Sequence, residues 1–221
     1  MDRITDVATI LAALSALAVA GVVLSGGSTG AAEAPLNPLG AVEEWEEFAE
    51  GGHRLGPEQA RITIVEFGDY ECPFCRLAES DLAEIMRAYS GDVALVYRHL
   101  PLRGHDRAYP AARAAECAGD QGNFWAFHSL LYSDDGWLSG DSTVEFLALA
   151  ERVGVPDMER FQACVENEES VPAIEADKLA AAELGFTGTP SFLVNGQRHR
   201  GAAIFDPNTF QRLYESLVDA R

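Results

Sequence analysis

The sequence predicts an α/β fold, and three stretches of the chain carry this prediction. Residues 62–97 read as a strand, a helix and a second strand, the pattern of a right-handed parallel βαβ unit. Residues 107–184 have a helical pattern throughout, interrupted at clusters of Gly, Pro and Asp. Residues 191–200 read as a β-hairpin, and a final helix follows. We therefore expect one α/β core with four or five helices inserted between its two parts.

Length and charge limit the possible functions. A chain of 221 residues with 48% hydrophobic content is long enough for one well-buried domain and an appendage. Asp and Glu outnumber Lys and Arg by 35 to 16, which gives a net charge of −19. Because phosphate binding needs clustered positive charge, we expect no nucleic-acid partner.

The N-terminal segment, residues 1–24, is predicted to be a signal-anchor or a signal peptide. Its stretch from Val7 to Leu24 contains no charged residue. As a helix this stretch would extend about 27 Å, close to the roughly 30 Å of a bilayer core. The alternative is a cleaved signal peptide, for which Ala32-Glu33-Ala34 offers a cleavage site. Both alternatives export the rest of the chain.

Residues 25–54 are predicted to be a flexible tether and a short helix, and residues 55–221 the folded domain. Residues 25–41 are small and rich in Gly and Pro, without periodicity. Residues 42–50 form the acidic short helix, in which Trp45 and Phe48 are expected to pack rather than bind a ligand.

A Cys-x-x-Cys pair follows the first strand of the domain. Residues 62–67 are mostly β-branched or aromatic, as in a buried strand, and apolar residues recur at helical spacing from Leu77 onward. This places Cys72 at a helix N-terminus, where unpaired N–H groups and the helix dipole stabilise a thiolate and lower its pKa. Cys75 lies three residues later on the same face, close enough to form a disulfide with Cys72. Pro73 suits the first turn because it has no N–H to lose.

Two other interpretations of the cysteine pair remain open. The pair could be half of a zinc site, but zinc needs about four ligands and no second pair follows at the usual spacing. It could also be a structural disulfide. The strand, proline and helix around the pair favour redox chemistry, and we expect neither a metal nor a cofactor.

The remaining elements complete the α/β pattern. Residues 93–97 read as the second strand, and a parallel unit would place Cys72 at the carboxyl edge of the sheet, where such sheets carry their sites. Asn195-Gly196 is a strong hairpin signal. Asp206 and Pro207 supply an N-cap and first position for the last helix.

Together these motifs resemble the thioredoxin superfamily, and more closely the membrane-associated branch of the DsbA-like thiol:disulfide oxidoreductases. Residues 189–196 are similar to that family's cis-proline loop and hairpin, and residues 97–128 to the start of its helical insertion. Glu66 matches a buried acid beneath the family's active site. The resemblance covers about residues 55–219. It implies a thioredoxin-like fold with an all-helical insertion at about residues 104–185, preceded by an N-terminal hydrophobic helix.

The resemblance also implies roles for individual residues. Cys72 is expected to be an exposed nucleophile, and Cys75 to resolve its mixed disulfide with the substrate. Glu66 would accept or relay the proton of Cys75, with its own pKa raised by burial; the alternative is a surface acid at a strand end. Thr189 and a cis Pro190 would face the cysteine pair, where the Thr189 backbone would pair with an extended substrate.

Two features lower the oxidising strength that we expect. Phe74, in the dipeptide Pro73-Phe74 between the cysteines, replaces a histidine of the best-known family members and supplies neither donor nor charge. The acidic stretch Asp69-Tyr70-Glu71 precedes the helix and opposes the formation of a thiolate.

Cys117 and Cys164 fall in the helical insertion, outside the redox pair. In an exported chain, we expect these two to form a structural disulfide. The alternatives are two buried free thiols and an exchange of partners with Cys72.

The five histidines carry no metal-binding motif, because no pair of them has helical spacing with a general-base Glu. Structural hydrogen bonds are expected for His99, His105 and His128. His53 and His199 are expected at the surface.

Three functional hypotheses follow. The first is an exported oxidase that forms disulfides in cysteine-containing proteins, recharged by a membrane redox partner as the resemblance implies. The second is an exported reductase or isomerase, and the third a non-enzymatic binding or metal-carrier module. The protein would be periplasmic or held at the outer face of the cytoplasmic membrane, attached through its N-terminal helix if that is not cleaved. Isomerases usually add a dimerisation domain, for which no length is left beyond the tether, so the oxidase is the preferred hypothesis. A monomer is expected.

Overall fold

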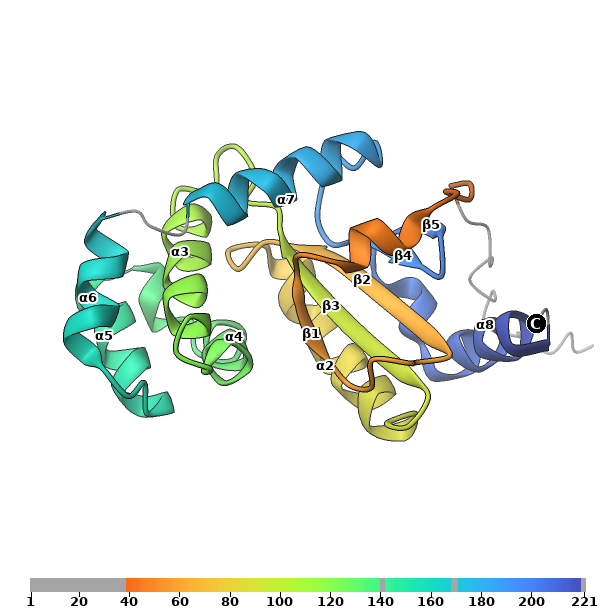
Figure 1. Cartoon of the computed structure of the whole chain (residues 1–221), viewed down its shortest axis with the longest axis horizontal. Helices are drawn as coiled ribbons and strands as arrows, with labels where there is room; N and C mark the ends of the chain where they lie inside the picture. Colours follow the sequence, from red (N-terminus) through yellow and green to blue (C-terminus); the bar gives the residue numbers. More distant parts are fainter. Residues whose placement is uncertain (1–38, 140–141, 168–170, 220–221) are drawn as a thin grey trace, which may run out of the picture. The chain divides into compact units, whose positions relative to one another are not determined.

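The computed structural model describes residues 39–139, 142–167 and 171–219 (Figure 1). The predicted signal segment and residues 25–38 of the predicted tether lie outside these ranges. Within the described ranges, no helix combines the length and the apolar character needed to cross a membrane.

A five-stranded mixed sheet in the order β1-β3-β2-β4-β5 is the centre of the fold. The two central strands, β2 and β3, are parallel, and the other strand pairs are antiparallel. Both central strands are buried along their whole length, as expected for strands covered on both faces. The strands span His53–Leu55 (β1), Ile62–Gly68 (β2), Val93–His99 (β3), Ser191–Val194 (β4) and Gln197–Arg200 (β5).

Helices cover both faces of this sheet. Helix α2 (Pro73–Ala88) links the parallel strands, so the predicted βαβ unit is confirmed, and it packs on one face near α8 (Pro207–Asp219). The short 3₁₀ helix η1 (Trp45–Ala49) and α7 (Val171–Glu183) pack on the other face. The alternation along β2 explains the division, because Ile62 and Ile64 join the first core, whereas Val65 and Phe67 join the second.

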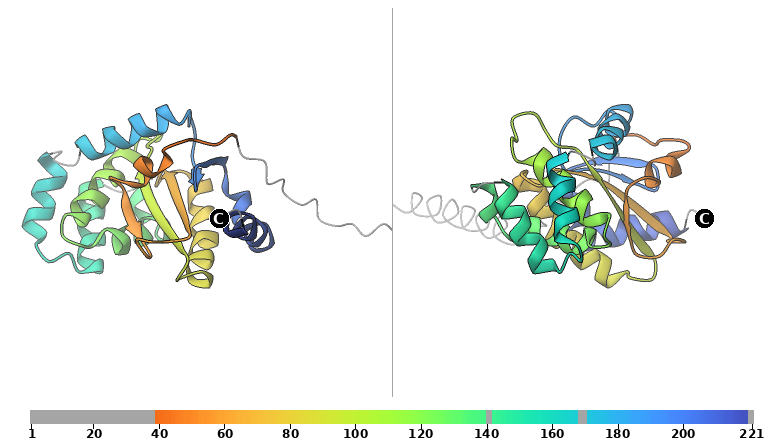
Figure 2. Two further views of the ribbon diagram at one scale, coloured as in Figure 1. Left: turned by 45° about the vertical axis from the view of Figure 1, so that its right-hand side comes forward. Right: turned by 60° about the vertical axis from the view of Figure 1, so that its left-hand side comes forward.

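The predicted helical insertion lies between β3 and β4, and its core also includes Tyr70, Cys72, Cys75 and Tyr97 of the βαβ unit. Helices α3 to α6 gather at one end of the sheet, and α7 returns the chain to it, as both sets of views show (Figures 1 and 2). The disulfide predicted between Cys117 and Cys164 is present and joins α3 to α6. The elements are α3 (Ala108–Gly119), α4 (Phe124–Ser133), η2 (Gly136–Leu138), α5 (Ser142–Val153), α6 (Met158–Asn167) and α7.

The folded domain begins earlier than predicted. The N–H of Leu39 donates to the carbonyl of Arg198 at 2.7 Å, and that of Val42 to Gly196 at 2.8 Å. Further on, β1 pairs with β3. Residues 39–41 belong to the predicted tether of residues 25–41, but the backbone here is hydrogen-bonded to a hairpin distant in sequence. The predicted helix at 42–50 is shorter and is 3₁₀.

The predictions for the C-terminal part are confirmed. Strands β4 and β5 flank Asn195 and Gly196, both at positive φ as a tight hairpin turn requires. Asp206 caps the last helix, because its Oδ1 accepts the N–H of Thr209 at 3.1 Å.

Candidate active site at a helix N-terminus

The cysteine pair lies where β2 meets α2. The strand ends at Gly68, and helix α2 begins at Pro73 with Cys72 as its N-cap residue. The N–H of Cys72 donates to the carbonyl of Asp69 at 3.1 Å, which closes the turn between the two elements. Only glycine fits at position 68, since a Cβ there would lie 2.5 Å from the ring of Tyr97. The predicted position of Cys72 at the helix N-terminus is confirmed.

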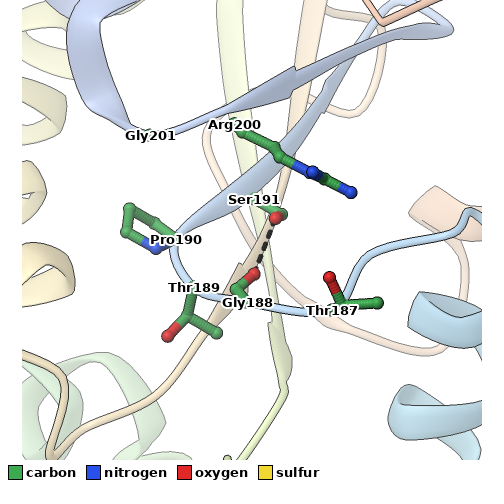
Figure 3. Close-up of a pocket in the computed structure, with 7 residues that line it drawn as sticks. All are labelled: Thr187, Gly188, Thr189, Pro190, Ser191, Arg200 and Gly201. Atoms are coloured by element: carbon green, nitrogen blue, oxygen red, sulfur yellow. Dashed lines mark hydrogen bonds between the residues drawn. The ribbon is translucent and has the colours of Figure 1, made fainter.

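The loop before β4 faces this helix end. The Thr189–Pro190 peptide bond is cis, as predicted. The thiol of Cys72 lies 3.5 Å from the carbonyl oxygen of Thr189, although the two residues are 117 positions apart. Figure 3 shows that Ser191 braces the loop, with its hydroxyl donating to the carbonyl of Gly188 at 2.7 Å. Residues 187–191, 200 and 201 line a cavity of about 220 Å³ on this loop.

The two thiols have opposite ionisation properties. Hydrogen bonds from the Cys75 thiol, from Thr189 and from the backbone at Cys75 and Phe74 lower the pKa of Cys72 to about 5, against the effect of its burial. Burial raises the pKa of Cys75, and its hydrogen bond to Cys72 raises it further. Cys72 is thus the thiolate at neutral pH, and Cys75 keeps its proton.

Cys72 is less accessible than predicted. The residue is 4% exposed and Cys75 is fully buried. The expectation of an exposed nucleophile was wrong because the loop at Thr189 covers the sulfur. The side chains of Phe74 and Leu77, by contrast, are each 66% exposed. They lie three residues apart on one face of α2 and form an apolar rim at the start of this helix.

Glu66 is the buried acid that the sequence predicted, not a surface acid. It is 1% exposed, and its Oε2 atom is buried without a hydrogen-bond partner. Burial raises the pKa of Glu66 well above its usual value, and the charges of Glu79 and Cys72 raise it further. On the adjacent strand its register partner is Tyr97, an aromatic residue rather than a cation.

The carboxylates of the acidic stretch before the helix accept hydrogen bonds from neighbouring groups. One oxygen of Asp69 accepts the N–H of Glu71 at 2.8 Å, and the other lies 2.7 Å from Nδ1 of His105. Partial burial lowers the pKa of His105, but its hydrogen bond to Asp69 and the charges of Asp69, Glu71 and Cys72 together raise it by more. These contacts reduce the opposition to a thiolate that the sequence led us to expect.

The histidines form buried contacts that sequence reasoning only partly foresaw. His99, His105 and His128 each make the expected side-chain contact, to Glu116, Asp69 and Glu79 respectively. The expectation of a surface position was wrong for His199, whereas the side chain of His53 is 28% exposed. His199 is 4% exposed, because β5 turns its side chain inward, and burial lowers its pKa.

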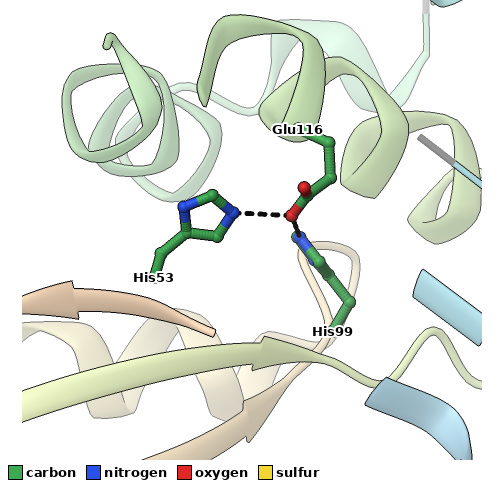
Figure 4. Close-up of side chains that lie close together, drawn as sticks. All are labelled: His53, His99 and Glu116. Atoms are coloured by element: carbon green, nitrogen blue, oxygen red, sulfur yellow. Dashed lines mark hydrogen bonds and ion pairs between the residues drawn. The ribbon is translucent and has the colours of Figure 1, made fainter. Parts of the chain in front are cut away.

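His53 and His99 meet at one carboxylate, which Figure 4 shows. Their Nε2 atoms lie 2.7 and 2.8 Å from Oε1 of Glu116. Burial opposes ionisation of this carboxyl group, but the two histidines lower its pKa to about 2. No motif could reveal the cluster, because its members are 63 and 17 positions from Glu116 in the sequence.

This geometry defines a class of protein. A low-pKa thiol at a helix N-terminus, a buried partner thiol, a buried acid below them and a facing cis-proline loop make a thioredoxin-fold dithiol protein. The family model described as "Thioredoxin" matches residues 49–216, and the chain belongs to this family. Within the family, the chain matches the DsbA-type thiol–disulfide oxidoreductases.

Two solved structures illustrate the match. A thioredoxin-like oxidoreductase from Silicibacter pomeroyi is 33% identical, with a TM-score of 0.65 over 81% of this chain and 97% of that one. DsbA2 from Pseudomonas aeruginosa is 30% identical, with a TM-score of 0.57 over 74% of this chain and 92% of that one.

The first curated relatives are much longer than this chain. The Na⁺/H⁺ antiporter NhaA 1 of Salinispora arenicola is 40% identical over 151 residues, which is 68% of this chain but 22% of the antiporter. The chain thus spans about a fifth of the length of the first curated relatives that it matches.

Proposed function

We propose that this chain is an extracytoplasmic oxidase that transfers its Cys72–Cys75 disulfide to cysteine-containing protein substrates. The observation that carries the proposal is the difference between the two thiols, of which Cys72 has a pKa of about 5 while that of Cys75 is raised. A stabilised Cys72 thiolate favours the reduced protein, and so makes the disulfide form a better oxidant.

The reaction begins with the Cys72–Cys75 disulfide. A substrate thiolate attacks Sγ of Cys72, the bond to Cys75 breaks, and a mixed disulfide forms between Cys72 and the substrate. Cys75 leaves as a thiolate and takes a proton. The buried carboxyl group of Glu66, with its raised pKa, is suited to donate that proton.

A second substrate thiolate then attacks the substrate sulfur of the mixed disulfide. Cys72 leaves as a thiolate, which needs no proton because its pKa is about 5. The substrate has gained a disulfide and lost two electrons, which the Cys72 and Cys75 sulfurs now hold. A membrane redox partner would remove these electrons and restore the disulfide.

The rim and the loop beside Cys72 are suited to hold the substrate. An extended substrate segment would pair with the backbone at Thr189, whose carbonyl lies 3.5 Å from the Cys72 sulfur. Apolar substrate side chains would contact Phe74 and Leu77, which are two-thirds exposed. Such apolar side chains are accessible in proteins that have not finished folding.

The equilibrium reduction potential of the Cys72/Cys75 pair tests the direction of the reaction. We expect a potential well above about −220 mV, the oxidising end of the glutathione range, when the protein is equilibrated in a glutathione buffer. A potential below about −260 mV, as in thioredoxin-type reductants, would instead identify a reductase and overturn the oxidase proposal. Full-chain protein is used, and Cys72 is quantified by mass spectrometry after alkylation at low pH.

A further inference from the structure

Three potential metal ligands converge at a second place in the molecule, where the sheet meets the helical insertion. His53 lies on β1, His99 on β3 and Glu116 on α3. The ligand atoms of the three residues lie within 4.8 Å of one another, and both imidazole Nε2 atoms face the same carboxylate oxygen (Figure 4). The mechanism of thiol exchange uses none of these side chains.

The ligands are held in place by their surroundings. The ring of His53 stacks on Phe124 with centroids 3.4 Å apart and planes 6° from parallel. Gly119 leaves room for this ring, since a Cβ there would lie 3.0 Å from its Cε1 atom. His99 is 1% exposed and lies beside the ring of Tyr97. A site on strands and a helix, with rings locked by packing, has little ordering left to do when an ion binds.

We propose that His53, His99 and Glu116 form a binding site for a divalent transition-metal ion of the zinc class. Two imidazole nitrogens and one carboxylate oxygen are the protein ligands of a common type of open zinc site, which leaves a fourth position for water. The mixed nitrogen and oxygen donors favour zinc, cobalt or nickel over calcium or magnesium, which prefer all-oxygen ligands.

Binding rearranges protons in a defined way. Each imidazole must offer its Nε2 lone pair, so the proton now shared with Glu116 moves to Nδ1 or leaves for solvent. The carboxylate then ligates the ion instead of accepting these hydrogen bonds. The ion replaces the present contacts and ties β1 and β3 to α3. It thus adds stability without taking part in thiol chemistry.

Titration of the full, tag-free chain with Zn²⁺ and Co²⁺ tests the site. The protein is first treated with a chelator and oxidised, so that Cys72 and Cys75 form a disulfide and cannot bind the metal. We expect one Zn²⁺ per chain by calorimetry, and a Co²⁺ absorption spectrum typical of nitrogen and oxygen ligands without a thiolate band. We also expect Zn²⁺ to raise the midpoint of thermal unfolding.

Single substitutions test whether Zn²⁺ binds at His53, His99 and Glu116. His53→Ala and Glu116→Gln should each weaken Zn²⁺ binding by about 100-fold or more, because even changes to residues behind a ligand cost about 10- to 100-fold. His105→Ala is the matched control, since it removes a different histidine paired with a carboxylate, Asp69, and should bind as the original chain does.

Two results would overturn the proposal. One is the absence of stoichiometric binding to the original chain. The other is equal affinity in the original chain and both ligand variants, which would place the ion elsewhere. Circular dichroism verifies that each variant folds. If Glu116→Gln does not fold, His53→Ala decides the outcome, because its side chain is 28% exposed on an edge strand. Disulfide exchange by metal-free protein is measured separately, so this site and the proposed oxidase stand or fall independently.

Discussion

Two buried carboxyl groups, Glu66 on a sheet strand and Asp177 on a helix that packs on the sheet, have opposite environments. Asp177 on α7 is 4% exposed, and its oxygens accept Nε of Arg98 at 2.6 Å and the N–H of His99 at 2.7 Å. Glu66 on β2 is 1% exposed, and its Oε2 has no partner. Burial raises the pKa of both, but Arg98 and His99 pull that of Asp177 back, whereas Glu79 and Cys72 push that of Glu66 higher.

The different environments of Asp177 and Glu66 indicate different roles, the first in stability and the second in reactivity. A buried charge that is fully hydrogen-bonded fixes one arrangement of the chain, here α7 against β3. A buried acid without a partner is costly to ionise, and such perturbed groups gather at functional sites. Changes at the paired group should therefore affect unfolding, and changes at the cysteines and Glu66 should affect exchange.

The largest effect on disulfide exchange is expected from a substitution of Cys72. Cys72→Ser should reduce disulfide exchange to the uncatalysed rate, because the serine oxygen cannot form the mixed disulfide. Circular dichroism should show an unchanged fold, since serine is close to cysteine in size and can still donate to the Thr189 carbonyl oxygen. The measurement is oxidation of a dithiol peptide by stoichiometric protein. Peptide oxidation retained in this variant would remove Cys72 from the mechanism.

The largest effect on stability is expected at the paired carboxylate. Asp177→Ala should lower the free energy of unfolding by about 3–5 kcal/mol, because it leaves Arg98 buried without its partner. Denaturant unfolding measures this value.

A surface ion pair provides the control for this prediction. Asp134 pairs with Arg152, but their side chains are 33% and 52% exposed. Asp134→Ala should therefore cost about 1 kcal/mol or less. Equal losses in the two variants would contradict the view that pairing in the interior fixes α7 in place.

Loss of the Cys117–Cys164 disulfide should lower stability and leave disulfide exchange unchanged. The disulfide closes a loop of 47 residues, for which the chain-entropy model gives about 4 kcal/mol as an upper figure. The Cys117→Ala/Cys164→Ala variant should unfold at a lower denaturant concentration and exchange disulfides at the original rate. Lost exchange in a folded variant would show that the insertion core contributes to the reaction.

The reactivity of Cys72 should depend on pH at an unusually acidic value. With a pKa of about 5, alkylation of reduced protein should be half-maximal near pH 5. The rate should fall about tenfold between pH 7 and pH 4, because the thiolate is the reacting form. Mass spectrometry of the Cys72 peptide measures the rate of alkylation at each pH. A midpoint above about pH 8, the range of free cysteine, would contradict the lowered pKa.

The same pKa predicts how pH affects the reduced protein. Because the folded-state pKa of Cys72 is lower than the unfolded one, its thiolate stabilises the reduced fold most at high pH. This contribution should decrease as the pH falls from about 8 to 5. The oxidised protein lacks the thiolate, so the difference in unfolding free energy between the two forms isolates the effect.

Features of the fold and the site could be predicted from the sequence where the residues that form them are close together along the chain. Local sequence patterns determine three elements, namely the strand before Cys72, the helix after Pro73 and the hairpin at Asn195-Gly196. All three were predicted. Asp177 and Arg98 are 79 positions apart without a motif, so their pairing was not foreseen.

The accessibility of Cys72 and the start of the domain were missed for the same reason. The sulfur is covered by a loop 117 positions further along the chain. Residues 39–42 pair with β5 through backbone groups, which leave no trace in the choice of side chains. Glu66 is intermediate, because its burial was implied by the resemblance to the DsbA-like family, whereas its unpartnered oxygen required coordinates.

Glu66→Gln is the change that most directly compares the two carboxyl groups. Glutamine keeps the size of the acid but cannot transfer its proton, so exchange should slow by about 10- to 100-fold, at or below the low end for acid–base catalysis. The free energy of unfolding should change by less than about 1 kcal/mol, because a buried acid of raised pKa is replaced by a neutral side chain of the same shape. Stopped-flow reduction of the Cys72–Cys75 disulfide by a small thiol gives the rate.

Asp177→Asn is the matched substitution at the paired site. It removes the charge that Arg98 and the His99 N–H require, so it should lower stability by more than Glu66→Gln does and leave the rate of exchange unchanged. If Glu66→Gln unfolded the protein as readily as Asp177→Asn while exchange stayed fast, the unpartnered acid would be a structural group. Reactivity would then rest on the helix N-terminus and the two thiols alone.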